Sequence, residues 1–142
     1  MRLRRIAGTK EKLLAHQHII LMKPAEKKGH WREHFGNTNK IILEIGCGRG
    51  LFITTAAKLY PHNNYIGLEL REEMVYDCIK RLGDAVPPNL AFLWQEASLL
   101  DEIFAKGEVD RICLNFSDPW PKTKHHKRRL THPRFLRLYQ EI

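Results

Sequence analysis

Long apolar runs and paired cysteines are both absent from this 142-residue sequence. No run approaches the roughly 20 apolar residues that a membrane-spanning helix needs, and MRLRRIAG does not lead into the apolar core of a secretory signal. Cys47, Cys78 and Cys113 stand more than 30 residues apart and form no CxxC motif. We therefore expect a cytoplasmic protein with free thiols, no membrane association, and neither a zinc site nor a disulfide framework.

Internal repeats and low-complexity linkers are also missing, so nothing divides the chain. Its length and its 43% hydrophobic content suit one globular domain over residues 1–142, with residues 1–36 as a basic N-terminal extension of that domain. The oligomeric state is open between a monomer and a homodimer.

Charge is unevenly distributed along the chain. Ten Lys and Arg face three acids in residues 1–40, and seven face one in residues 120–142, whereas residues 41–119 hold seven against twelve acids. Two basic ends around an acidic centre indicate a polyanion bound around a site for a cationic group. Nucleic acid is the favoured partner; a membrane surface or simple solvation remain alternatives.

Strand and helix patterns alternate four times. Strands are expected at residues 40–44, 64–69, 90–94 and 110–116, and helices at residues 9–22, 51–60, 74–82 and 99–104, with a further helix beginning near Phe135. This alternation predicts a doubly wound α/β fold with a mostly parallel sheet.

The first chemical motif is EIGCGRG, from Glu44 to Gly50, directly after the first expected strand. Gly46, Gly48 and Gly50 allow a tight turn and close approach of a ligand. The third glycine comes one residue too early for a dinucleotide fingerprint, and the Glu44 carboxylate would repel a pyrophosphate but attract the ammonium and sulfonium of S-adenosylmethionine. Glu69, at the end of the second strand, can accept hydrogen bonds from ribose hydroxyls. S-adenosylmethionine is favoured over a nicotinamide cofactor or a structural turn.

The second motif is NFSDPWP, residues 115–121, after the fourth expected strand. In open α/β sheets the carboxyl ends of the strands line the ligand crevice, so Asp118 is expected to face the glycine motif. Pro119 and Pro121 stiffen the loop, and Trp120 can either stack on a base or pack the corner. An ordinary proline turn is the alternative to a functional corner.

The third motif is the basic run KTKHHKRR, residues 122–129. Five cations would repel a metal ion, so its histidines are not interpreted as metal ligands. Contact with nucleic-acid phosphates is the better interpretation, although such a run can also be a solvated face.

Taken together, LNFSDPWPK, KRRLT, EIGCGRG and NYIGLE closely resemble the bacterial tRNA (guanine-N7-)-methyltransferases, over nearly the whole chain. The resemblance implies a Rossmann-like methyltransferase domain, here truncated after the fourth strand and the following helix. It implies methyl transfer from S-adenosylmethionine to N7 of a guanine in the tRNA variable loop.

The resemblance also implies residue roles. Glu44, Glu69 and Glu96 are expected to bind the cofactor, and Asp118 to lie at the catalytic centre; Glu96 stands where the family usually has aspartate. The full set of expected cofactor residues is Glu44, Gly46, Gly48, Gly50, Glu69, Glu96, Ala97 and Asp118. The expected tRNA contacts are Lys122, Lys124, His125, His126, Lys127, Arg128 and Arg129.

Guanine N7 carries a lone pair and no proton, so the expected reaction needs no general base. Asp118 would then accept hydrogen bonds from the guanine and stabilise the positive charge that develops on it. Two alternatives remain. One is a methyltransferase acting on amino groups of adenine or cytosine, and the other is a catalytically incomplete RNA-binding fragment.

Overall fold

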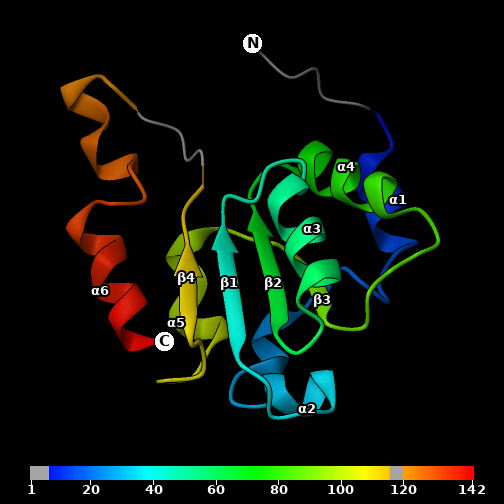
Figure 1. The fold of residues 1–142 in the computed structure, drawn as a ribbon. Coiled ribbons are helices and arrows are strands. Elements are labelled where there is room, and N and C mark those ends of the chain that lie inside the picture. The colour runs from blue at the N-terminus through cyan, green and yellow to red at the C-terminus, as the bar shows by residue number, and fades with distance from the viewer. Residues whose placement is uncertain (1–6, 116–119) are drawn as a thin grey trace.

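The computed structural model describes residues 7–115 and 120–142 and contains a four-stranded, parallel sheet (Figure 1). The strand order is β3-β2-β1-β4, which places β4 at one edge. The strands are β1 Ile41–Ile45, β2 Asn64–Glu69, β3 Leu90–Trp94 and β4 Arg111–Cys113. Within the described ranges, no helix is both long enough and apolar enough to cross a membrane.

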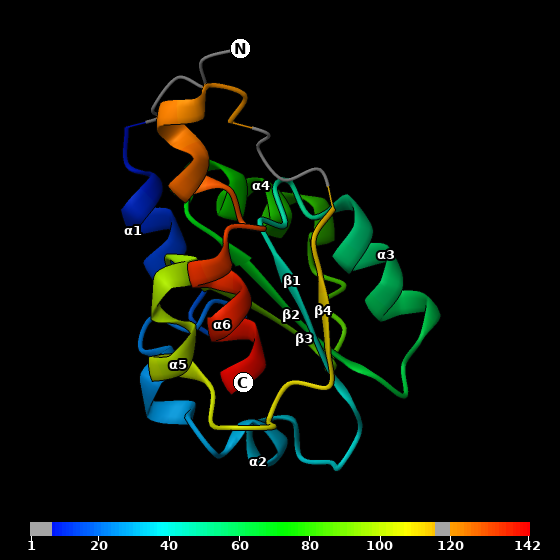
Figure 2. The same ribbon diagram turned by 90° about the vertical axis from the view of Figure 1, so that its left-hand side faces the viewer.

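Helices cover both faces of the sheet, as Figure 2 shows with α3 on one side and α5 and α6 on the other. The α-helices are α1 Thr9–Leu14, α2 Trp31–Phe35, α3 Leu51–Leu59, α4 Glu72–Leu82, α5 Leu100–Ile103 and α6 Pro133–Glu141. Three 3₁₀ helices join them: η1 Pro24–Lys27, η2 Ala97–Leu99 and η3 Thr123–Arg128. The doubly wound α/β architecture is thus confirmed.

The alternation of side chains along β1 divides the core into two layers. Ile42 packs with α3 and α4, whereas Ile41, Leu43 and Ile45 pack with α5 and α6 on the opposite face. All five β1 side chains are buried, as expected for a central parallel strand. Glu44 lies two residues after Ile42 on the strand, so its side chain is on the same face of the sheet as that of Ile42. Its carboxylate is therefore enclosed on the α3 side.

Several predicted elements match closely. The strands at 64–69 and 90–94 have the predicted bounds, the first strand is shifted by one residue, and α3 ends one residue early. The fourth strand is shorter than predicted, because regular pairing with β1 ends at Cys113; Phe116 lies outside the described residues. The predicted helix at 99–104 is divided between η2 and the single turn of α5.

The predicted helix over residues 9–22 is wrong beyond Leu14. The amide of Phe92 donates to the Ile19 carbonyl at 2.9 Å and the amide of Leu21 donates to the Phe92 carbonyl at 3.1 Å, so Ile20 pairs with Phe92 of β3 in an isolated parallel bridge. Ile19 and Ile20 are fully buried there. Their apolar spacing suits a helix, but pairing with an open strand edge satisfies both burial and backbone hydrogen bonds.

Candidate cofactor and nucleic-acid site

A cavity of about 580 Å³ opens at the carboxyl ends of β1, β2 and β3. Its walls come from the glycine loop, the segments after β2 and β3, and the chain from Trp120 to Phe135. Four separate parts of the sequence therefore meet where open α/β sheets bind ligands. Six predicted site residues line it: Gly46, Gly48, Glu69, Glu96, Ala97 and Arg128.

Glu69 holds the glycine loop against the end of β2. Its Oε2 accepts a hydrogen bond from the amide of Gly48 at 2.9 Å, and its Oε1 accepts from the amides of Leu70 and Arg71 at 3.0 and 3.1 Å. Gly46 and Gly48 have φ angles of 73° and 56°, a region that favours glycine. The carboxylate that was predicted to accept ribose hydroxyls is thus also anchored by three backbone donors.

Gly50 is not among the cavity-lining residues. A Cβ atom there would lie 2.8 Å from Sγ of Cys78, so the glycine allows α3 to approach α4 closely. The Cys78 thiol donates to the Gly48 carbonyl at 3.1 Å. In the structure, Gly50 and Cys78 therefore shape the loop from beneath.

Glu44 does not line the cavity, although the next two residues of the chain, Ile45 and Gly46, do. It is 3% exposed, its Oε1 accepts from Nδ2 of Asn115 at 3.5 Å, and its Oε2 has no partner among residues 7–115 and 120–142. Burial raises the pKa of Glu44 to about 7; the Asn115 hydrogen bond opposes this, and the negative charge of Glu69 adds to it. Burying a carboxylate oxygen without a hydrogen-bond partner costs free energy, and a cationic ligand that pairs with the oxygen would offset this cost.

The segment after β3 supplies the opposite wall. Glu96 is exposed and accepts a hydrogen bond from Oγ of Ser98 at 3.2 Å, and Ala97 is buried at the start of η2. Both line the cavity together with Glu69. Two carboxylates at neighbouring strand ends suit a ligand with several hydroxyl or amino donors.

Trp120 forms a tightly held corner against the cavity. Its φ is 43°, a strained value for a non-glycine residue. Nε of Arg129 donates to its carbonyl at 3.0 Å, the Arg128 guanidinium lies 5.1 Å from its ring centroid, and the His125 ring meets it edge-on at 5.5 Å. Part of the basic run therefore holds the tryptophan.

The other basic residues of the run lie outward on η3 or just before it. Lys122, Lys124, His126 and Lys127 are exposed, and Nδ1 of His126 contacts the Thr123 carbonyl at 2.9 Å. A carbonyl only accepts, so Nδ1 of His126 is the donor in this contact. Asp118, the predicted catalytic residue, lies outside the described residues.

Sequence reasoning missed a wall built by Leu130, Arg134 and Phe135. Cδ1 of Leu130 lies 3.7 Å from the position of a Cβ on Gly46, and the Tyr139 hydroxyl donates to the Leu130 carbonyl at 2.8 Å. The apolar spacing of α6 marks a helix, but it does not tell which sheet edge that helix reaches.

Comparison with known proteins places this arrangement among methyltransferases. Residues 38–142 match the family model described as "Putative methyltransferase". The tRNA (guanine-N(7)-)-methyltransferase of Brevibacillus brevis is 49% identical over the whole chain, which covers 66% of that relative. The enzyme of the same name from Streptococcus sanguinis is 43% identical, with 67% covered. The chain thus spans about two thirds of the length of these relatives.

Solved structures agree on the fold. The antibiotic-resistance methyltransferase Kmr superposes with a TM-score of 0.61 at 18% identity, covering 80% of this chain and 58% of that one. PKMT2 from Rickettsia typhi gives 0.58 at 21% identity, covering 87% of this chain and 23% of that one. A methyltransferase from Methanococcus maripaludis gives 0.54 at 15% identity and covers the whole of this chain and 62% of that one.

Proposed function

Because this chain belongs to the bacterial tRNA (guanine-N7-)-methyltransferase family, we propose that it takes part in transferring a methyl group from S-adenosylmethionine to N7 of a guanine in the tRNA variable loop.

The observation that carries the cofactor assignment is the state of Glu44. Glu44 comes directly before Ile45 and Gly46, which line the cavity, and one of its oxygens has no partner among the described residues, which suits an ammonium group; the two glutamates that line the cavity suit ribose hydroxyls. A nicotinamide dinucleotide would bring its pyrophosphate to the same glycine loop, where Glu44 and Glu69 would repel it. The residues present therefore fit S-adenosylmethionine.

Each cofactor residue has a distinct task in the proposal. Glu44 pairs with the ammonium, Glu69 and Glu96 accept hydrogen bonds from the adenosine part, and Gly46, Gly48 and Ala97 leave room for it. When bound, S-adenosylmethionine supplies a methyl group activated by the sulfonium charge. Gly50 acts indirectly, through the packing of Cys78 beneath the loop.

The target base would be held by the corner after β4. Asp118 accepts hydrogen bonds from the guanine and stabilises the charge that develops on the ring, while Trp120 forms the adjoining wall. No proton leaves N7, so the site positions its reactants and needs no general base. Lys122, Lys124, His125, His126, Lys127, Arg128 and Arg129 belong to the proposed tRNA-binding segment.

The test is methyl transfer to unmodified tRNA by the purified protein, followed by nucleoside digestion and mass analysis. We expect 7-methylguanosine, and we expect Asp118→Asn to slow single-turnover transfer by roughly two orders of magnitude, as for the loss of one preorganised electrostatic contact. Methyl on an exocyclic amine would overturn the assignment in favour of an amino-group methyltransferase. Binding of tRNA without binding of cofactor would favour an RNA-binding fragment.

A further inference from the structure

Two arginines of α6 lie beyond the basic run but next to it in space. Arg134 and Arg137 are three residues apart and exposed, whereas Phe135, Leu138 and Tyr139 pack into the core. Residues three apart on a helix share a face. Helix α6 therefore buries one side against the sheet layer and presents a basic side to the outside.

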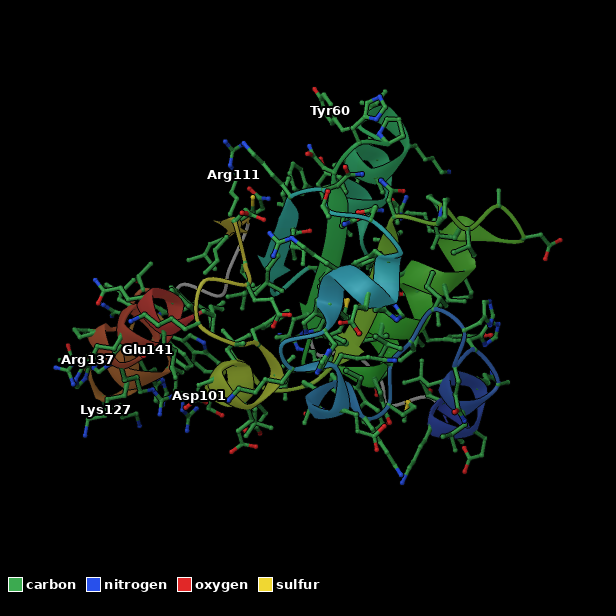
Figure 3. All side chains as sticks on the ribbon, turned by 90° about the horizontal axis from the view of Figure 1, so that it is seen from below. Tyr60, Asp101, Arg111, Lys127, Arg137 and Glu141 are labelled. Carbon is green, nitrogen blue, oxygen red and sulfur yellow. The ribbon has the colours of Figure 1, made fainter. Side chains whose placement is uncertain are left out.

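This basic side continues the surface of η3. The rings of His126 on η3 and His132, the N-cap of α6, lie 5.3 Å apart. In the view of Figure 3, Lys127 and Arg137 project outward at the same side of the molecule, far from Arg111 and Tyr60. Arg134 and Arg128 both line the rim of the cavity, so the surface also reaches the proposed cofactor site.

Basic side chains lie close together here. Partial burial, then the charges of His126, Arg134, Lys127 and Arg137, lower the pKa of His132, which places all four groups within electrostatic range of it. In the part of the chain that the structure describes, neither Arg134 nor Arg137 forms an ion pair. Glu141, the one acid of residues 120–142, lies one turn beyond Arg137.

We propose that the tRNA-binding surface extends from η3 onto the first two turns of α6, where Arg134 and Arg137 contact phosphates of the bound RNA. This rests on the proposed function, which supplies the polyanion. A phosphate backbone offsets the mutual repulsion of this cluster, and a planar guanidinium can donate two hydrogen bonds to one phosphate. The surface ends where Glu141 begins to repel the RNA.

The experiment measures the salt dependence of tRNA binding, by fluorescence anisotropy with an unmodified transcript. Arg134→Ala/Arg137→Ala should lower the slope of log K against log salt by about 1.4–1.8, since each lost phosphate contact removes about 0.7–0.9. Arg137→Ala alone should remove about half of that. Arg134 also lines the cavity, whereas Arg137 does not. The Arg137→Ala variant therefore tests the RNA contact without changing a residue of the cavity wall.

The matched control is Lys40→Ala/Lys58→Ala, which removes two exposed cations from the opposite end of the strands. Its slope should equal that of the wild type, and far-ultraviolet circular dichroism should show that all variants remain folded. A wild-type slope in both arginine variants would overturn the inference while leaving the proposed reaction intact. The converse result, a reduced slope with no 7-methylguanosine formed, would overturn the reaction and support the surface.

Discussion

At the residue scale, Glu44 combines burial, an unpartnered oxygen and a pKa raised to about 7. The same residue lies near the carboxyl end of the central strand, directly before Ile45 and Gly46, which line the cavity. A group that costs stability in the empty protein and suits a cationic ligand is typical of a functional site.

Cofactor affinity should therefore depend on pH. Only the ionised Glu44 pairs with an ammonium, so below pH 7 the affinity for S-adenosylmethionine should fall by up to tenfold per pH unit. Calorimetry between pH 5.5 and 8 measures this. Glu44→Gln should bind weakly at every pH and lose this dependence; an unchanged profile in that variant would contradict the role of Glu44.

The same residue should make the empty protein less stable as pH rises. A carboxyl whose pKa is about 7 when folded and 4.5 in its ordinary state contributes stability that is full below 4.5 and lost as pH rises through 7. Without cofactor at pH 8, Glu44→Gln should thus exceed the wild type in unfolding free energy, by about 3 kcal/mol at most. Urea unfolding at pH 5 and pH 8 tests this: no gain at pH 8 would show that burial of the charge is not costly.

The basic run should divide into two functional groups. Arg129 holds the carbonyl of Trp120, which lines the cavity, whereas Lys124 and Lys127 are exposed. Lys124→Ala/Lys127→Ala should weaken tRNA binding and leave S-adenosylmethionine affinity unchanged. Arg129→Ala should weaken both, the cofactor by several-fold, because the strained corner loses its hydrogen bond. Equal effects of the two variants on cofactor titrations would count against this division.

At the element scale, α6 matters because it positions the Leu130 wall. Tyr139 is half-buried in α6, its hydroxyl holds the Leu130 carbonyl at 2.8 Å, and burial raises its pKa to about 12. Leu130 in turn packs near Gly46 of the glycine loop. Through Tyr139 and Leu130, α6 is therefore linked to the glycine loop that lines the cavity.

Tyr139→Phe tests this connection. Loss of one hydrogen bond should lower the unfolding free energy by about 1 kcal/mol and reduce cofactor affinity a few-fold by loosening Leu130. Tyr60→Phe is the matched control, since Tyr60 is 58% exposed and should change neither quantity. Denaturant unfolding and cofactor calorimetry measure the two effects, and a Tyr139→Phe variant with full cofactor affinity would separate α6 from the site.

At the scale of the whole molecule, the two proposed ligands should respond to pH in opposite directions. Partial burial and neighbouring cations lower the pKa of His132, which favours its neutral imidazole in the free protein. Bound phosphates would favour the charged imidazole. Affinity for tRNA should therefore rise as pH falls from 7.5 to 6, while cofactor affinity falls; His132→Gln should reduce the rise in tRNA affinity. Parallel pH series for the two ligands test this, and identical trends would contradict it.

Local chemistry in the sequence was enough for the strands at 64–69 and 90–94, for the positions of Glu44 and Glu69 at strand ends, and for the glycine loop. Apolar runs between turn residues and glycines at positive φ leave few alternatives. The helix predicted over residues 9–22 was wrong beyond Leu14, because residues 19–21 form hydrogen bonds with Phe92 at the exposed edge of β3. The local sequence does not show that such an edge lies nearby. Only the tertiary structure shows three further features. Leu130 and Arg134 line the cavity, Arg129 donates a hydrogen bond to the Trp120 carbonyl, and the basic surface of η3 continues onto α6. The first of these depends on packing between segments that are far apart in the sequence, and the other two on side-chain contacts within residues 120–137; hydrophobic periodicity shows neither.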